Sequence, residues 1–128
     1  MSDYRGVIIE ESLKDPLLMQ GIPIEKTVVV TVTEAHETPW LAQWTKHYVC
    51  IPEDQAKRLA EQLSEAFEQD HPGEWYADFC NDTHHYIIFP GQVLYVDRRD
   101  HAQYLAVTEY GISVGIPPHQ VNFSRFFL

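Results

Sequence analysis

The stretch that decides the fold is Tyr76–Asp97, YADFCNDTHHYIIFPGQVLYVD. It holds three short runs rich in aromatic and β-branched residues, which are typical of strands. Asn-Asp-Thr at 81–83 and Pro-Gly-Gln at 90–92 separate these runs with residue types that favour turns. Because connections this short cannot carry a crossover, we expect an antiparallel meander. Its three strands are predicted at Trp75–Cys80, His84–Phe89 and Val93–Asp97.

The rest of the chain supplies more strands and two helices. Clusters of β-branched residues predict strands at Val7–Glu10, Thr27–Thr33 and Thr45–Ile51. Apolar residues recur every three to four positions over Glu53–Gln69, which predicts an amphipathic helix. A second helix is predicted over His101–Val114, because a capping-box spacing precedes it and a glycine and two prolines follow it.

These elements fit one domain. A chain of 128 residues is close to the commonest domain size. It has no internal repeat and no low-complexity linker. We therefore predict one α+β domain over residues 1–128, with a mainly antiparallel sheet of about five or six strands and two principal helices packed on one face.

The composition narrows the class of partner. Nine basic and 19 acidic residues give a net charge of -10, which opposes the phosphate neutralisation that nucleic-acid binding requires. No apolar run approaches the roughly 20 residues that a membrane helix needs. The first residues lack the basic and apolar pattern of a secretory signal, so we expect a cytoplasmic protein. The two cysteines, Cys50 and Cys80, form no CxxC pair.

The register of the meander decides which side chains share a face. Directly opposed residues of an antiparallel pair point to the same side. A three-residue loop at 81–83 would place Cys80 opposite His84 and Asp78 opposite Tyr86. An even-length loop would mix polar with apolar side chains, so the three-residue loop is preferred. The second turn would then place Tyr86 opposite Tyr95 and His84 opposite Asp97.

This register suggests a polar site. His84 could act as a base beside Asp78 or Cys80, in a small enzyme or a metabolite-binding protein. No glycine nest or helix N-terminus follows Cys80 to hold an oxyanion. His84 and His85 are neighbours in a strand and point to opposite faces, so the doublet does not make a metal motif. We predict no metal and no cofactor.

Aromatic side chains point to binding instead. Tyr76, Tyr86 and Tyr95 would form a platform across neighbouring strands, and Trp40 and Trp44 lie in a segment between two strands. We therefore predict a binding protein acting through these residues. Its partner would be another protein or a second copy of the chain, with a small molecule as the alternative. The apolar tail, Phe123–Leu128, is expected to dock on its own domain or on a partner chain.

Overall fold

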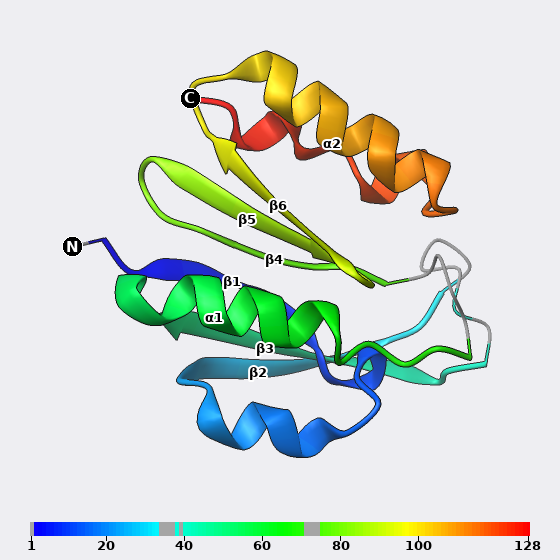
Figure 1. Ribbon diagram of the computed structural model, residues 1–128. Coiled ribbons are helices and arrows are strands. Elements are labelled where there is room, and N and C mark those ends of the chain that lie inside the picture. The colour runs from blue at the N-terminus through cyan, green and yellow to red at the C-terminus, as the bar shows by residue number, and fades with distance from the viewer. Residues whose placement is uncertain (1, 34–37, 39, 71–74) are drawn as a thin grey trace.

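In the computed structural model, residues 2–33, 38, 40–70 and 75–128 are described. Within them, six strands form one antiparallel sheet in the order β2-β3-β1-β4-β5-β6 (Figure 1). The strands are β1 (Tyr4–Ile9), β2 (Ile24–Thr31), β3 (Gln43–Ile51), β4 (Ala77–Cys80), β5 (His84–Phe89) and β6 (Gln92–Asp97). The α-helices are α1 (Glu53–Ser64) and α2 (His101–Ser113). The α+β class and the antiparallel sheet are thus confirmed.

Short 3-10 helices connect and end these elements. Two follow β1, at Glu10–Ser12 and Pro16–Gly21, and two follow α2, at Pro118–Gln120 and Phe123–Phe126. The helix predicted to continue to Gln69 ends at Ser64, and Phe67 instead forms an isolated bridge with Leu13. No helix in the described ranges is both long and apolar enough to cross a membrane.

The helix α1 covers one face of the sheet, the α1 side. Its apolar stripe is Ala56, Leu59, Ala60 and Leu63, all buried. The stripe packs into a core that includes side chains from β1, β3, β4 and β5. Acidic residues in the first turn, Glu53 and Asp54, complement the positive end of the helix dipole. The start of the helix and its buried stripe are therefore where the sequence pattern places them, although the helix is shorter than predicted.

The helix α2 lies on the opposite face, the α2 side. Tyr104 and Val107 pack with Ile87 from β5, whereas the next residue, Ile88, belongs to the core under α1. Neighbouring residues of a strand point to opposite faces, so the two helices flank the sheet rather than share one face. The predicted placement differs because β5 is buried on both sides, and each side needs its own cover. Figure 1 shows α2 beside the C-terminal segment, apart from α1.

The C-terminal segment docks on its own domain. Phe123 is fully buried, and the N–H of Leu128 donates to the carbonyl of Arg98 at 2.9 Å. The Arg98 Nε donates to the carbonyl of Phe126 at 3.0 Å. The tail was predicted to dock either on its own domain or on a partner chain, and the structure shows it on its own domain. The segment also forms one wall of a cleft on the α2 side.

The two hairpins of the meander differ in how well their register was predicted. Between β5 and β6 the predicted pairs are confirmed, with Tyr86 opposite Tyr95 and His84 opposite Asp97. Between β4 and β5 the predicted register is wrong by one residue, because Cys80 pairs with His85. The turn is closed by Asn81, whose N–H donates to the carbonyl of His84 at 3.0 Å.

The side chain of Asn81 explains this tighter turn. Its Oδ1 accepts from the N–H of Thr83 at 3.0 Å and from the N–H of His84 at 2.8 Å. An Asn side chain that bonds to the backbone two residues on stabilises a turn of this kind. The consequence is that Asp78 and Cys80 share the α2 side with His85, while His84 lies on the α1 side.

Candidate functional site

A cleft of about 300 Å³ opens on the α2 side, between β1, β3, β4 and the turn at Phe123–Phe126. This volume is at the small end of the range for ligand pockets. Apolar and aromatic side chains provide much of the wall, and a few charged groups project among them. The lining residues are Arg5, Gly6, Val7, Trp44, Lys46, Tyr76, Asp78, Cys80, Arg125 and Phe126.

The cleft gathers positive charge. Arg5, Lys46 and Arg125 are three of the nine cationic residues in a chain of net charge -10. Within the described residues, neither Lys46 nor Arg125 pairs with a carboxylate. Arg5 lies 3.4 Å from Glu25 in a largely exposed contact, which stabilises the fold little. The local charge of the cleft is thus opposite in sign to that of the whole protein.

The strand register fixes the order of these charges. Lys46 on β3 pairs with Ile9, and Arg5 lies four residues earlier on β1. At about 3.3 Å per residue, the rows that carry these two cations are roughly 13 Å apart. Val7 lies between them on β1 and pairs with Asp78 on β4. One carboxylate therefore lies between two cationic ends.

A buried hydrogen-bonded chain holds that carboxylate. Asp78 Oδ2 lies 2.7 Å from Nε2 of His85, and Nδ1 of His85 lies 3.0 Å from the hydroxyl of Tyr104. The side chains of His85 and Tyr104 are fully buried. The ring of Phe126 packs edge-on against His85 with centroids 4.7 Å apart, so the tail covers the imidazole.

The polarity of the chain follows from the phenol. Burial raises the pKa of Tyr104 to about 12, although the Arg98 guanidinium beside it lowers the pKa. The hydroxyl is therefore protonated at neutral pH. A carboxylate oxygen only accepts, so the Nε2–H of His85 donates to Asp78. In the neutral imidazole the other ring nitrogen is an acceptor, so Nδ1 accepts the phenol hydrogen of Tyr104.

Cys80 lines the same cleft but is poorly suited to nucleophilic chemistry. Burial raises the pKa of its thiol, the nearby Arg98 lowers it, and the net shift is upward. The thiolate, which is the reactive form, is therefore depleted at neutral pH. Both ring nitrogens of the nearby His85 already have partners. These observations weigh against Cys80 as an activated nucleophile.

The two cysteines do not meet. Cys50 on β3 and Cys80 on β4 both pair with Arg5 of the intervening strand β1. Two strand spacings amount to about 10 Å, which exceeds the separation that a disulfide can bridge. Both thiols are free.

His84, the predicted base, lies on the other face. Its ring stacks on Tyr95, with centroids 4.8 Å apart and an interplanar angle of 5°. Its Nδ1 lies 2.9 Å from the hydroxyl of Thr83. The structure therefore separates His84 from Asp78 and Cys80. The histidine that bonds to Asp78 is His85, which the sequence analysis missed, and the turn-forming Asn81 was the signal that could have identified it.

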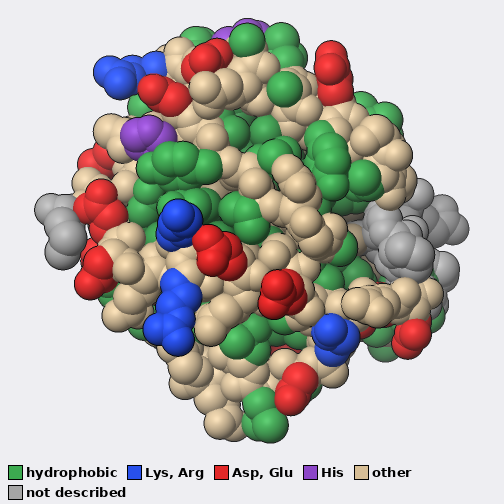
Figure 2. All heavy atoms as spheres, viewed as in Figure 1, with side chains coloured by type: hydrophobic (Ala, Val, Ile, Leu, Met, Phe, Trp, Pro, Cys, Tyr) green, Lys and Arg blue, Asp and Glu red, His purple; other side chains and the backbone are tan. Residues whose placement is uncertain are grey.

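The predicted tyrosine platform is also divided. Tyr86 and Tyr95 lie together on the α1 side, with ring centroids 4.5 Å apart, and Tyr4 joins them. Tyr76 is on the α2 side, where its hydroxyl donates to the carbonyl of Gln120 at 2.6 Å. Tyr95 is 53 % exposed. Figure 2 shows hydrophobic side chains gathered over this part of β5 and β6.

The tryptophans lie beside the core. Trp40 and Trp44 pack against the buried Trp75, with centroid distances of 6.4 and 5.9 Å. Trp40 remains partly exposed, whereas Trp44 also lines the cleft on the α2 side. Covering the core is thus one role of both residues.

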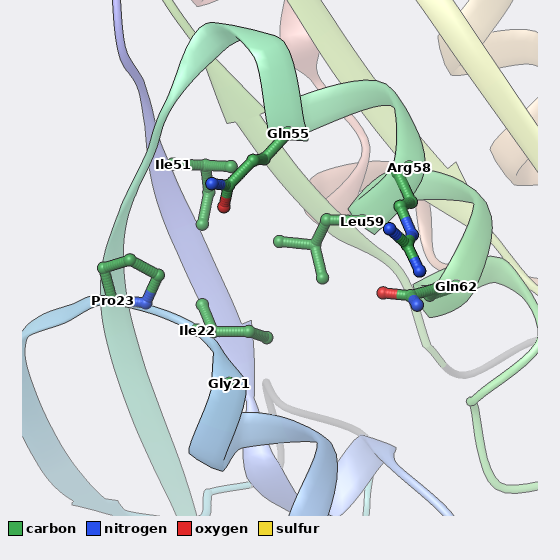
Figure 3. A pocket seen from close by; sticks show the side chains of 8 residues that line it. All are labelled: Gly21, Ile22, Pro23, Ile51, Gln55, Arg58, Leu59 and Gln62. Carbon is green, nitrogen blue, oxygen red and sulfur yellow. The ribbon is translucent and has the colours of Figure 1, made fainter.

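A second cleft, of about 290 Å³, lies on the α1 side between α1 and the turn that precedes β2. Figure 3 shows Gln55, Arg58 and Gln62 projecting from α1 toward an apolar floor that contains Ile22 and Leu59. Its lining includes one cation and no acid. The cleft on the α2 side, in contrast, combines three cations with an oriented carboxylate.

The described part of the chain contains no group of three or more His, Cys, Asp or Glu side chains arranged to hold a metal ion. Comparison with known proteins found no matching family model, no matching curated protein and no matching solved structure. The geometry of the cleft is accordingly the basis on which a function can be argued.

Proposed function

We propose that the protein binds a small organic anion in the cleft on the α2 side. The observation that carries this proposal is the convergence of Arg5, Lys46 and Arg125 on one cavity in an acidic protein. Two of these cations have no carboxylate partner in the described ranges, so an anionic ligand would supply one. An arginine fork suits a carboxylate or phosphate in particular.

The apolar wall supports an organic ligand rather than a bare inorganic ion. Val7, Trp44 and Phe126 line the same cavity as the cations. Small-molecule sites are mostly apolar, with a few placed polar groups that fix orientation. The cations would bind the anionic groups while the aromatic rings cover the carbon skeleton. Two free thiols suit a reducing compartment, so the cytoplasm remains the proposed location.

Calorimetric titration with a panel of mono- and dicarboxylates and organic phosphates tests this function. Arg125→Gln and Lys46→Gln should each weaken binding about tenfold, because each removes a charge-assisted contact. Arg99→Gln and Lys57→Gln are matched controls, since neither residue lines the cleft. No binding by any member of the panel, or equal losses in the control variants, would contradict the proposal.

A second candidate function is self-association through the exposed aromatic surface of the α1 side. Tyr95 is 53 % exposed although its ring is fixed by stacking on His84. Rigid exposed tyrosines are frequent in protein interfaces. We propose a second copy of the chain as the partner. Sedimentation should show a dimer that Tyr95→Ser weakens; a monomer at every concentration would rule this function out.

A further inference from the structure

We propose that the anion bound in the cleft is an acidic amino acid, whose ammonium group donates to Asp78. This inference rests on the proposed function and adds the chemical class of the ligand. It follows from three features of the cleft: the polarity of the buried chain behind Asp78, the fixed orientation of that carboxylate, and its position among the cations.

The polarity of the chain makes Asp78 an acceptor toward the cleft. Tyr104 donates to His85, and His85 donates to Oδ2 of Asp78. A carboxylate has two oxygens and about four acceptor sites, and among the described residues only His85 bonds to this one, so the other oxygen retains its capacity to accept. Because the side chain is partly exposed and lines the cleft, that capacity is available to a ligand. The matching group on the ligand is a hydrogen-bond donor.

The orientation of Asp78 is fixed from behind rather than by the cleft. Among the described residues its side chain bonds to His85, and it pairs with none of the three cleft cations. Two fully buried polar side chains thus hold one carboxylate in a single direction. Support of this kind preorganises a binding group, because the group need not reorient when the ligand arrives.

The position of Asp78 selects an ammonium among possible donors. Arg5 and Lys46 lie on rows roughly 13 Å apart, and Asp78 lies between them. Three cations and one carboxylate complement a molecule with two anionic groups and one cationic group. An amino dicarboxylic acid has this charge pattern. A neutral hydroxyl in the same place would leave the charge of Asp78 unmatched.

A matched pair of ligands tests the inference directly. L-Glutamate and glutarate have the same carbon chain and the same two carboxylates, and differ in the ammonium group. Titration calorimetry on the full chain should show glutamate binding at least about tenfold more tightly, because a charged hydrogen bond is gained. L-Aspartate and succinate form a second pair with a shorter chain.

Asp78→Asn should remove this preference. The amide oxygen can still accept from His85, so the fold is retained, while the charge for the ammonium group is lost. The variant should bind glutarate at least as tightly as the unsubstituted protein does. Glu10→Gln, which alters the carboxylate of a similar chain at His47, is the control and should keep the preference.

The outcomes separate the two proposals. Equal affinity for the two members of each pair would overturn the inference and leave anion binding intact. A preference that persists in Asp78→Asn would likewise overturn the role of Asp78. Binding by neither dicarboxylates nor amino acids at millimolar concentration would overturn anion binding, and the inference with it.

Discussion

Two histidines of this protein have almost the same surroundings. His47 has the hydroxyl of Thr27 2.8 Å from Nδ1 and a carboxylate oxygen of Glu10 3.0 Å from Nε2. His85 has the hydroxyl of Tyr104 on Nδ1 and a carboxylate oxygen of Asp78 on Nε2. Both imidazoles are buried. The chemistry of hydroxyl, imidazole and carboxylate is therefore repeated on the two faces of the sheet.

What differs is the environment of the carboxylate. The side chain of Glu10 is 40 % exposed and lines neither of the two clefts described above, whereas that of Asp78 is 19 % exposed and lies among three cations. Such a chain therefore serves first to satisfy the hydrogen-bonding groups of a buried imidazole. It becomes a candidate site where its carboxylate faces a cavity.

The largest effect is expected from removing the cover of the His85 chain. Deletion of Phe123–Leu128 removes the buried Phe123 and the ring of Phe126 that packs on His85. Loss of one buried phenylalanine alone costs about 3–5 kcal/mol. Urea denaturation should therefore show a much lower midpoint. A midpoint equal to that of the full chain would show that the tail does not stabilise this region.

Replacing each histidine should separate the two chains. His85→Ala should lower the free energy of unfolding by about 3 kcal/mol, because Tyr104 loses its partner in a buried site. His47→Ala should cost about 1 kcal/mol, since water can solvate the exposed Glu10. Urea denaturation of the two variants would measure both losses of stability. Equal losses in the free energy of unfolding would show that the two histidines contribute equally to stability, contrary to this prediction.

Removing only the hydroxyls should give a smaller difference with a distinct pH dependence. Tyr104→Phe should cost about 1–2 kcal/mol at neutral pH, and Thr27→Val less, because Thr27 is exposed. The folded-state pKa of Tyr104 is raised to about 12, above the usual value of about 10. Its contribution is fully present below pH about 10 and is lost as the pH rises through about 12.

Stability measured across alkaline pH checks that sign. The slope of stability against pH above 10 should be shallower in Tyr104→Phe than in the unsubstituted protein. Burial also raises the pKa of Tyr4, Tyr76 and Tyr86, so a residual slope is expected in the variant. An unchanged slope would mean that Tyr104 is not the buried acid of the chain.

The smallest expected effect concerns the two thiols on either side of Arg5. Burial raises the pKa of both Cys50 and Cys80, so both should alkylate more slowly than a free thiol at pH 8. Only Cys80 lines the cleft. Glutarate should therefore slow the alkylation of Cys80 about twofold or more and leave Cys50 unchanged, as peptide mass mapping would show. Equal protection of both thiols would place the ligand elsewhere.

The fold was predictable because its signals are local. The apolar stripe of α1 and the Pro-Gly turn between β5 and β6 can each be recognised from residues close together in the sequence. The structure has a helix and a turn at these positions. The positive φ of Gly91 in that turn is the conformation that glycine readily adopts. The continuous apolar run of β5 predicts a strand that is buried on both faces. That prediction would have placed the two helices on opposite faces of the sheet.

The candidate site was harder to predict because it depends on contacts between distant residues. Sorting polar from apolar side chains favoured the wrong register at Asn81, since the sorting assumes that polar residues avoid the core. Asp78 and His85 share a buried face because they satisfy each other and Tyr104. Arg5, Lys46 and Arg125 come from three segments that are far apart in the sequence. Their local sequence does not predict that they line one cleft.

We propose above that the cleft on the α2 side binds an organic anion. Heteronuclear NMR titration of the labelled chain with glutarate tests it most directly. We expect saturable shifts confined to the residues around the cleft, above all Arg5, Lys46, Asp78 and Arg125. Saturable shifts centred instead on Gln55, Arg58 and Gln62 in the cleft beside α1, or no shifts at all, would contradict it.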